Sequence, residues 1–366
     1  MKVGILTFPN SISYGATLQM YALYRAVEKM GHGVEIINYH NAYMKAEKHV
    51  TQKTKSRTRA MLRRMLHCRL YGAFRCFEKE NMVFYPKKSV DQCGCLPEIA
   101  KRFSAVICGS DQVWNPDITD KDLSYFLDFC GESTRRIAYA PSFGVENLAA
   151  EFFAQVSEEL GKFHAISVRE KSGQHLVQQM LNREVTMVVD PTMLLDASDW
   201  SAMEQPHSLG RGEYILYYTI RRSESLMRFC RHLSKQTGLK IVVVGGNPLD
   251  ALRKRDEMVD YAVDISPKQW LFLVHHARYV VTNSFHGTAF SINYRKDFYV
   301  EFSSLTNSRL ANIVQIFGLQ DRVVKEGALE NLADVDYSRV AQELPTLQEQ
   351  SLSYLRNALE AGEICG

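Results

Sequence analysis

The chain has 366 residues, of which 46% are hydrophobic and 23% charged, and its formal net charge at pH 7 is +3. This composition excludes a disordered or collagen-like chain, and so small a net charge gives no support for nucleic-acid binding. Since a single core stops growing beyond about 250–300 residues, we expect two domains.

Short apolar runs alternate with helical stretches in the first half of the chain, a pattern typical of a parallel α/β sheet. Strands are predicted at Val3–Phe8, Val34–Tyr39, Ala105–Cys108, Arg136–Tyr139, Ala165–Val168 and Val185–Val189. Helices are predicted at Leu18–Met30, over residues 42–80, and between about Asn147 and Lys162.

A loop-like stretch over residues 205–212 interrupts this pattern, which then starts again. Further strands are predicted at Tyr214–Thr219, Lys240–Gly245, Arg278–Thr282 and Asp297–Val300. We therefore expect a first Rossmann-like domain over residues 1–190 and a second over residues 191–340. A C-terminal helix over residues 341–366 is expected to pack back on the first domain. In such α/β sheets ligands bind beyond the carboxyl ends of the strands, so we expect two facing domains with the ligand cleft between them.

The predicted insert at residues 42–80 is strongly basic. From Lys45 to Arg75 there are ten Lys or Arg residues and one acidic residue, Glu47. Such a run is often only the solvated face of a helix. The alternative is a surface for an anionic partner, either a phosphorylated substrate or the cytoplasmic leaflet of a membrane.

The sequence also predicts the compartment. Neither a signal peptide nor a run of about 20 apolar residues is present, so we expect a cytoplasmic protein, peripheral to the membrane at most. The eight cysteines are scattered, and Cys93-Gly-Cys95 has no second pair at zinc-ribbon spacing. We expect reduced thiols, no metal and no cofactor.

Two polar motifs follow strands of the first half. Asn10-Ser-Ile-Ser-Tyr14-Gly-Ala-Thr-Leu-Gln19 follows the first strand and opens the first helix, where a glycine lets backbone N–H groups approach an anion or a polar ligand. It lacks the GxGxxG pattern of a dinucleotide site and can equally be a plain strand-to-helix turn. Cys108-Gly-Ser-Asp-Gln-Val-Trp-Asn-Pro116 lies at the carboxyl end of another strand. There Asp111, Gln112 and Asn115 can hydrogen-bond sugar hydroxyls and Trp114 can stack on a sugar ring; a helix cap beside a core tryptophan is the structural alternative.

Cationic and proton-transferring residues follow other strands. Arg169 comes directly after a strand and is suited to carboxylate or phosphate, unless it forms a structural salt bridge. Thr282-Asn-Ser-Phe-His-Gly-Thr288 ends a strand and opens a helix, so Ser284, Gly287 and Thr288 are candidates for an anion site. His286 adds a side chain that moves protons near neutral pH.

Arg309 is a second candidate anion clamp, because it also follows a strand of the second half. His275 and His276 are adjacent in a predicted helix, where neighbouring residues do not face the same way. We therefore interpret them as residues of a helix end rather than as metal ligands.

The order and spacing of these motifs resemble the polysaccharide pyruvyl transferases. The resemblance rests on Tyr14–Gln19, Gly109–Trp114, Val168-Arg-Glu170, Asp190-Pro191 and Ser284-Phe-His-Gly287, and extends from residue 1 to about 330. It implies a fold like that of the GT-B glycosyltransferases. It also implies transfer of the enolpyruvyl unit of phosphoenolpyruvate to two hydroxyls of one sugar, giving a cyclic pyruvate ketal and phosphate in cell-surface polysaccharide biosynthesis.

The resemblance assigns a role to each candidate residue. His286 and Asp111 would transfer protons; Arg169, Arg309, Ser284, Gly287 and Thr288 would bind the donor; and Tyr14, Gln19, Gln112, Trp114 and Asn115 would bind the acceptor. Several family members have Arg-Leu-His where this chain has Ser284-Phe-His286, so Arg309 is the proposed replacement for that arginine. The acceptor sugar is expected to be linked to a lipid diphosphate or to a nucleotide.

Two other functions are compatible with the sequence. A GT-B glycosyltransferase using a nucleotide sugar would need a carboxylate to hold the ribose, and Glu301 can serve. A non-catalytic binding module of a polysaccharide assembly complex would release no phosphate with any acceptor.

Overall fold

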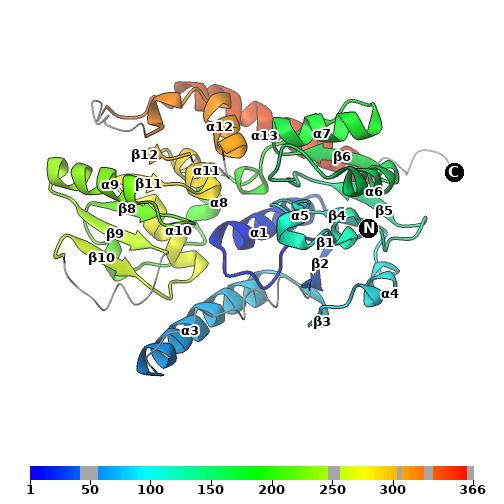
Figure 1. Ribbon diagram of the computed structural model, residues 1–366, viewed down its shortest axis with the longest axis horizontal. Helices are drawn as coiled ribbons and strands as arrows, with labels where there is room; N and C mark the ends of the chain where they lie inside the picture. The colour runs from blue at the N-terminus through cyan, green and yellow to red at the C-terminus, as the bar shows by residue number, and fades with distance from the viewer. Residues whose placement is uncertain (42–56, 246–255, 303–306, 325–332, 361–366) are drawn as a thin grey trace. The chain divides into compact units, whose positions relative to one another are not determined.

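The structure is a computed structural model that describes residues 1–41, 57–245, 256–302, 307–324 and 333–360 (Figure 1). The chain forms two compact units. The first unit comprises residues 1–52, 78–194 and 344–366, and the second unit comprises residues 53–77 and 195–343.

The first unit contains a seven-stranded sheet with the order β3-β2-β1-β4-β5-β6-β7, and all of its strand pairs are parallel. Its strands are β1 (Lys2–Leu6), β2 (Gly33–Tyr39), β3 (Phe84–Val90), β4 (Ala105–Cys108), β5 (Arg135–Ala138), β6 (Ala165–Val168) and β7 (Thr186–Met187). Nearly every residue of β1, β2 and β4 is buried, as expected of strands that are covered on both faces.

Helices of the first unit pack their apolar side chains against this sheet. They are α1 (Tyr14–Lys29), α4 (Leu96–Ala100), α5 (Pro116–Thr119), α6 (Ala150–Gly161) and α7 (Lys171–Leu181). One face of the sheet, including Leu6, Val106 and Ala138, packs with Phe152 of α6 and Leu176 of α7 in a single core. Helix α1 lies against β2, and the side chain of its Leu23 reaches the end of β4 at Gly109.

The second unit contains a five-stranded parallel sheet with the order β10-β9-β8-β11-β12. Its strands are β8 (Tyr214–Tyr218), β9 (Lys240–Val244), β10 (Val259–Ala262), β11 (Tyr279–Thr282) and β12 (Asp297–Val300). Its helices are α8 (Ala197–Ser201), α9 (Glu224–Thr237), α10 (Pro267–His276), α11 (Phe285–Asn293) and α12 (Asn307–Ile316), together with most of α3 (Arg57–Asn81).

Strand alternation sends the two faces of this second sheet to different helices. Ile215 and Tyr217 of β8 belong to the core that includes Phe229 and Leu233 of α9. Tyr218, the next residue of β8, instead packs edge-on against Trp270 of α10 at 5.2 Å between ring centroids. The sheet therefore has α9 on one face and α10, with its neighbour α11, on the other.

The last helix, α13 (Ser338–Glu360), begins in the second unit and belongs to the first from Leu344 onward. There Ser351 Oγ accepts a hydrogen bond from Val189 N at 3.0 Å, and Tyr354 OH donates to Ala138 O at 2.9 Å. The C-terminal half of α13 is therefore hydrogen-bonded to β5 and to the segment after β7.

The structure differs from the sequence-based elements in three places. Strands β3 and β10 were not predicted; both are edge strands, and their mixed burial interrupts the apolar run that signals a strand. Of the predicted insert at residues 42–80, residues 42–56 lie outside the described part. Within the described part of this insert, residues 57–77 belong to the second unit rather than to the first. Among the described residues, no helix is long and apolar enough to cross a membrane.

Candidate functional site

Each sheet has one point where the strand order reverses and the connections run in opposite directions. In the first unit it lies between β1 and β4, and in the second unit between β8 and β11. Ligands of open α/β sheets bind beyond the carboxyl ends of the strands at this point. Most of the polar motifs singled out in the sequence follow β1, β4, β8 or β11, so each unit has its own candidate site.

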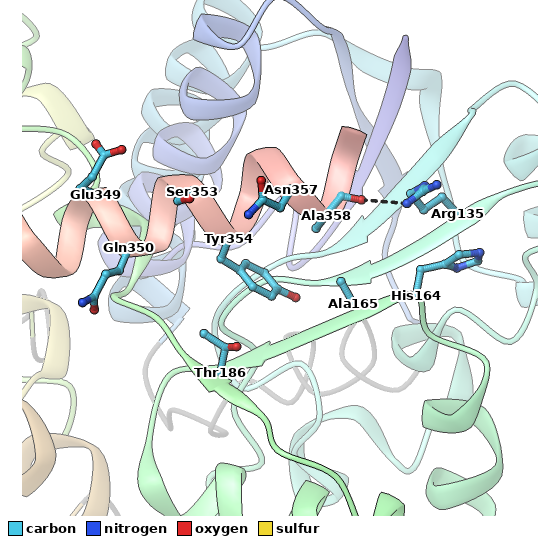
Figure 2. A pocket seen from close by; sticks show the side chains of 10 residues that line it. All are labelled: Arg135, His164, Ala165, Thr186, Glu349, Gln350, Ser353, Tyr354, Asn357 and Ala358. Carbon is cyan, nitrogen blue, oxygen red and sulfur yellow. Dashed lines mark hydrogen bonds between the residues drawn. The ribbon is translucent and has the colours of Figure 1, made fainter. Parts of the chain in front are cut away.

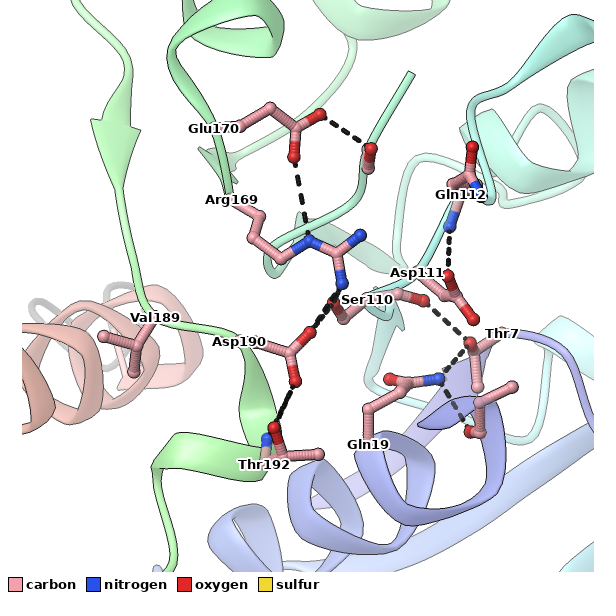
Figure 3. A network of polar contacts seen from close by, with 12 residues as sticks. Thr7, Gln19, Ser110, Asp111, Gln112, Arg169, Glu170, Val189, Asp190 and Thr192 are labelled. Carbon is pink, nitrogen blue, oxygen red and sulfur yellow. Dashed lines mark hydrogen bonds and ion pairs between the residues drawn. The ribbon is translucent and has the colours of Figure 1, made fainter. Parts of the chain in front are cut away.

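In the first unit, the strand ends are joined through Thr7, whose Oγ1 donates to Ser110 O at 2.9 Å. Gln19 of α1 is fully buried, and its Nε2 donates to Thr7 Oγ1 at 2.9 Å and to Ala16 O at 3.0 Å. Within the described part of the chain, no group hydrogen-bonds to Gln19 Oε1. Because a buried acceptor normally has a donor, this oxygen is an unsatisfied acceptor beside the switch point (Figure 3).

Arg169, directly after β6, lies in a buried network of acids beside these residues (Figure 3). Its Nη1 donates to Asp190 Oδ2 at 2.6 Å, and its Nε lies 3.7 Å from Glu170 Oε2. Ser110 Oγ also donates to Asp190 Oδ2, at 3.0 Å. Burial disfavours the charged guanidinium, but the charges of Asp190, Glu170 and Asp111 raise the pKa of Arg169 above its ordinary value. The guanidinium is charged and already neutralised by carboxylates.

The two carboxylates of this network are themselves held in place. Asp190 Oδ1 accepts hydrogen bonds from Thr192 N at 3.0 Å and Thr192 Oγ1 at 2.7 Å. Glu170 Oε1 accepts from Ser142 Oγ at 2.6 Å. The sequence analysis named Glu170 and Asp190 only as parts of two motifs and predicted no role for either residue. Their position directly after a strand and before a proline or a helix was the available signal for polar residues at a sheet edge.

Asp111 and Gln112 lie half-buried at the end of β4. Asp111 is a non-glycine residue with a φ of 81°, and strained backbone of this kind is often found at functional sites. Gln112 Oε1 accepts a hydrogen bond from Asn115 Nδ2 at 2.9 Å. A Cβ at Gly144 would lie 2.2 Å from the same oxygen, and Gly144 has a φ of +66°, so only glycine fits there.

The other acceptor candidates of the first unit differ in exposure. Tyr14 is half-buried at the start of α1. Asn115 is buried and caps α5, since its Oδ1 accepts from Asp117 N at 3.0 Å. Trp114 is 0% exposed, donates from Nε1 to Tyr125 O and stacks on Phe126 at 5.2 Å. The expectation that Trp114 stacks on a sugar does not fit this position, because its ring faces are covered by the core.

In the second unit, Asn283 joins the ends of β8 and β11. Its Oδ1 accepts from Ile220 N at 3.0 Å, and its Nδ2 donates to Arg221 O at 2.9 Å. Ser284 caps α11 by accepting from Gly287 N at 3.3 Å, and Thr288 Oγ1 donates back to Ser284 O at 3.1 Å. The hydroxyls of Ser284 and Thr288 therefore stabilise the helix start itself.

His286 and Gly287 occupy the first turn of α11. A Cβ at Gly287 would lie 2.4 Å from Thr282 Oγ1 and 3.0 Å from the Tyr218 ring, so the helix contacts the strands too closely for any other residue. His286 is only 6% exposed and meets the ring of Phe285 edge-on at 5.2 Å. The side chain that the sequence analysis selected for proton transfer therefore lies in a buried position.

Arg309 is buried in α12, which packs against α11. The structure thus brings Arg309 and His286 onto adjacent helices of the second unit, whereas Arg169 belongs to the first unit. The candidate donor residues are divided between the two units.

A separate hollow of the first unit lies along α13 (Figure 2). It is lined by Arg135, His164, Thr186, Tyr354 and other residues of α13 and the sheet. Arg135 and Thr186 are the first residues of their strands, and His164 directly precedes β6. Because this is the amino end of the sheet, opposite the switch point, the hollow is not the candidate active site.

Known proteins with a similar sequence pattern or a similar fold indicate the family and the fold class of this chain. The model of the polysaccharide pyruvyl transferase family matches residues 14–300. No curated protein sequence shows significant similarity to the chain. Among solved structures, the chain is similar to Staphylococcus aureus MnaA bound to UDP, with 10% identity, a TM-score of 0.53, and coverage of 98% of this chain and 96% of that one.

A second similar structure is the UDP-GlcNAc 2-epimerase of Methanocaldococcus jannaschii in complex with UDP-GlcNAc and UDP. The identity is 12%, the TM-score 0.51, and the match covers 99% of this chain and all of the other. At such identities the similarity concerns the fold alone. Together with the two parallel sheets, it confirms the predicted GT-B-like α/β fold class.

Proposed function

The chain belongs to the polysaccharide pyruvyl transferase family, as its motifs predicted, and from this premise we propose that it makes a cyclic pyruvate ketal on a sugar. The donor is phosphoenolpyruvate, and the product belongs to cell-surface polysaccharide biosynthesis in the cytoplasm. The observation that carries the proposal is the family match over residues 14–300, which includes the switch-point motifs of both units.

The proposed reaction has three steps. A proton is added to C3 of phosphoenolpyruvate, and a sugar hydroxyl adds to C2 and loses its proton. The C2–O bond to phosphate then breaks, leaving an oxocarbenium ion at C2. A second hydroxyl of the same sugar attacks C2, loses its proton and closes the ketal ring. The protein needs a proton donor and acceptor, cationic groups for carboxylate and phosphate, and a site that orients two hydroxyls.

On the donor side we assign His286 to proton transfer and Arg309 to an acidic group of the donor. Their helices α11 and α12 pack together, which supports a common role. Ser284, Gly287 and Thr288 form the start of α11, and a helix start favours a phosphate through its N–H groups and dipole. The hydroxyls of Ser284 and Thr288 contribute by fixing this helix start.

On the acceptor side we assign Gln19, Gln112, Asn115 and Tyr14 to the sugar. The Oε1 of Gln19, which accepts no hydrogen bond from the described residues, supports this assignment because it can accept one from a hydroxyl. Asp111, with its strained backbone, is the second proton-transfer group in this proposal. Trp114 is left out, because its indole is enclosed by aromatic rings of the core.

Arg169 is the remaining donor candidate. Asp190 and Glu170 orient its guanidinium in advance, but their charges also offset the attraction for an anion. The kinetics of Arg169→Lys separate the two roles. A donor contact predicts a raised KM for phosphoenolpyruvate, whereas a structural role predicts a lower melting temperature with an unchanged KM.

The exposed part of α3 supports a peripheral contact with an anionic membrane. Met65 and Tyr71 are 48% and 44% exposed, and the side chain of Arg69 between them is 67% exposed. Apolar and cationic side chains on one helix are typical of an interfacial helix. A lipid-diphosphate acceptor would be presented at such a surface.

Sedimentation with vesicles tests this contact. The protein should sediment with vesicles containing phosphatidylserine at low salt and be released near physiological ionic strength, where the Debye length is about 8 Å. Met65→Ser/Tyr71→Ser should weaken this binding. Equal binding to neutral vesicles, or none to either, would leave α3 as a solvated helix.

The reaction itself is tested by ligand-induced stabilisation and phosphate release. Phosphoenolpyruvate should raise the melting temperature more than UDP or GDP, and a suitable sugar acceptor should release inorganic phosphate from it. Stronger stabilisation by a nucleoside diphosphate would indicate a glycosyltransferase. Donor binding without phosphate release across lipid-linked and nucleotide-linked sugars would indicate a binding module.

A further inference from the structure

The last turn of α10 brings two adjacent histidines to one carboxylate in the second unit. His275 Nδ1 lies 2.8 Å from Glu204 Oε1, and His276 Nε2 lies 3.2 Å from Glu204 Oε2. The sequence analysis set this pair aside because neighbouring residues of a helix point in different directions. Both side chains nevertheless reach Glu204, because His275 contacts it through Nδ1 and His276 through Nε2.

Each member of this cluster is held by its surroundings. The His275 ring stacks on Tyr294 at 4.3 Å with only 9° between the planes, and the His276 ring lies 4.2 Å from that of Phe272. The Glu204 side chain is 9% exposed, and the next residue, Gln205, donates from its backbone N to Lys268 O at 3.1 Å. The rings of His275 and His276 are therefore held by aromatic neighbours, and the Glu204 carboxylate lies between these two imidazoles.

We propose that Glu204, His275 and His276 bind a divalent transition-metal ion, with Zn²⁺ as the representative. Two imidazoles and one carboxylate are a donor set that zinc accepts, with water in the fourth position. The candidate donor atoms all lie within 4.8 Å of one another. Ligands of a tetrahedral zinc ion are about 3.3 Å apart, so small side-chain rotations close the site. His276 is 46% exposed and provides the entry path.

Metal binding here would replace the two contacts to Glu204 with bonds to one ion. It would connect the segment after α8 to the end of α10, both within the second unit. A bound ion therefore stabilises this unit. This site is independent of the proposed pyruvyl transfer.

The experiment measures Zn²⁺ bound to the full-length protein by equilibrium dialysis, together with its melting temperature. Exposed thiols also bind zinc, so all variants are made in a Cys68→Ser/Cys76→Ser/Cys93→Ser/Cys95→Ser background, which removes the free cysteines that are exposed among the described residues. The test variants are Glu204→Gln, which keeps the shape of the side chain, and His276→Ala at the exposed position. His232→Ala, which removes an exposed histidine of α9, is the matched control.

The background protein and the His232→Ala control should each bind one Zn²⁺ and gain on the order of 5 °C in melting temperature at a hundredfold excess over Kd. Glu204→Gln and His276→Ala should lower the affinity at least tenfold and lose this gain, while their metal-free melting temperatures show whether they are folded. The proposal is overturned if the background binds no zinc, or if both test variants bind it as tightly as the His232→Ala control.

Discussion

The Asp190→Asn substitution is the sharpest test of the buried network in the first unit. Asp190 is 2% exposed and accepts hydrogen bonds from Arg169 Nη1, Ser110 Oγ, Thr192 N and Thr192 Oγ1. An asparagine keeps the oxygen that faces Thr192 but presents an NH₂ group to two donors, Arg169 and Ser110. The Arg169 guanidinium would then remain buried, and its ion pair with Asp190 would be lost while the longer contact with Glu170 is kept. Breaking one partner of a buried pair costs about 3–5 kcal/mol. For a unit of this size that corresponds to roughly 10 °C in melting temperature.

The assay is thermal unfolding followed by circular dichroism, with two companion variants. Glu98→Gln removes a carboxylate of an exposed pair with Lys101 and should change the melting temperature by only about 1–2 °C. The double variant Asp190→Asn/Arg169→Met removes both charges of the Arg169–Asp190 pair and should be more stable than the sum of its single changes predicts. If Asp190→Asn melts within about 2 °C of the unaltered protein, the carboxylate is not required to balance Arg169, and the reasoning is refuted.

Three further predictions concern single residues. His286→Gln, which keeps hydrogen bonding but not proton transfer, should lower the rate of phosphate release by about 10²–10⁴-fold while donor binding persists; a loss below tenfold would move proton transfer to another residue. Gly287→Ala should destabilise the second unit by about 1–3 kcal/mol in urea unfolding, because its Cβ would meet Thr282 Oγ1, whereas Gly72→Ala, with open space around it, should not. A hydrogen bond from Arg102 lowers the pKa of Glu35, so its contribution to stability is present above the unfolded-state pKa of about 4.3 and is lost as the pH falls through the folded-state pKa. Glu35→Gln should therefore flatten the loss of stability on acidification, and an unchanged slope would contradict this.

Much of the fold was predictable because buried parallel strands read as continuous apolar runs. Strands β4, β6 and β12 were predicted with their observed bounds. The two missed strands show the limit of this signal. Strand β3 contains Pro86, Lys87 and Lys88, which an edge strand tolerates because one side has no ladder partner. A pattern of apolar residues cannot detect a strand whose side chains are half-exposed.

The candidate site was predicted less completely, because its contacts join residues far apart in sequence. The motif around Ser284 and His286 was correctly placed after a strand and at a helix start. The proposed role of Trp114 required a ring face that is open to solvent. Phe126 and Phe143, which come later in the chain, cover this ring, and the motif itself gives no sign of them. The pairing of His275 and His276 with Glu204 depends on side-chain rotamers, and these are not encoded in helical spacing.

The path of the chain between its two units has a consequence for synthesis. The first unit takes its strands from residues before Leu194 but also includes α13, whose Ser351 and Tyr354 hydrogen-bond to Val189 and Ala138. A ribosome makes α13 only after the whole second unit has been translated. All strands of the seven-stranded sheet are therefore synthesised before the second sheet. The helix α13 that packs on this first sheet is added only when nearly all 366 residues have been synthesised. During that interval the apolar surface that α13 will cover is open to chaperones and to neighbouring nascent chains.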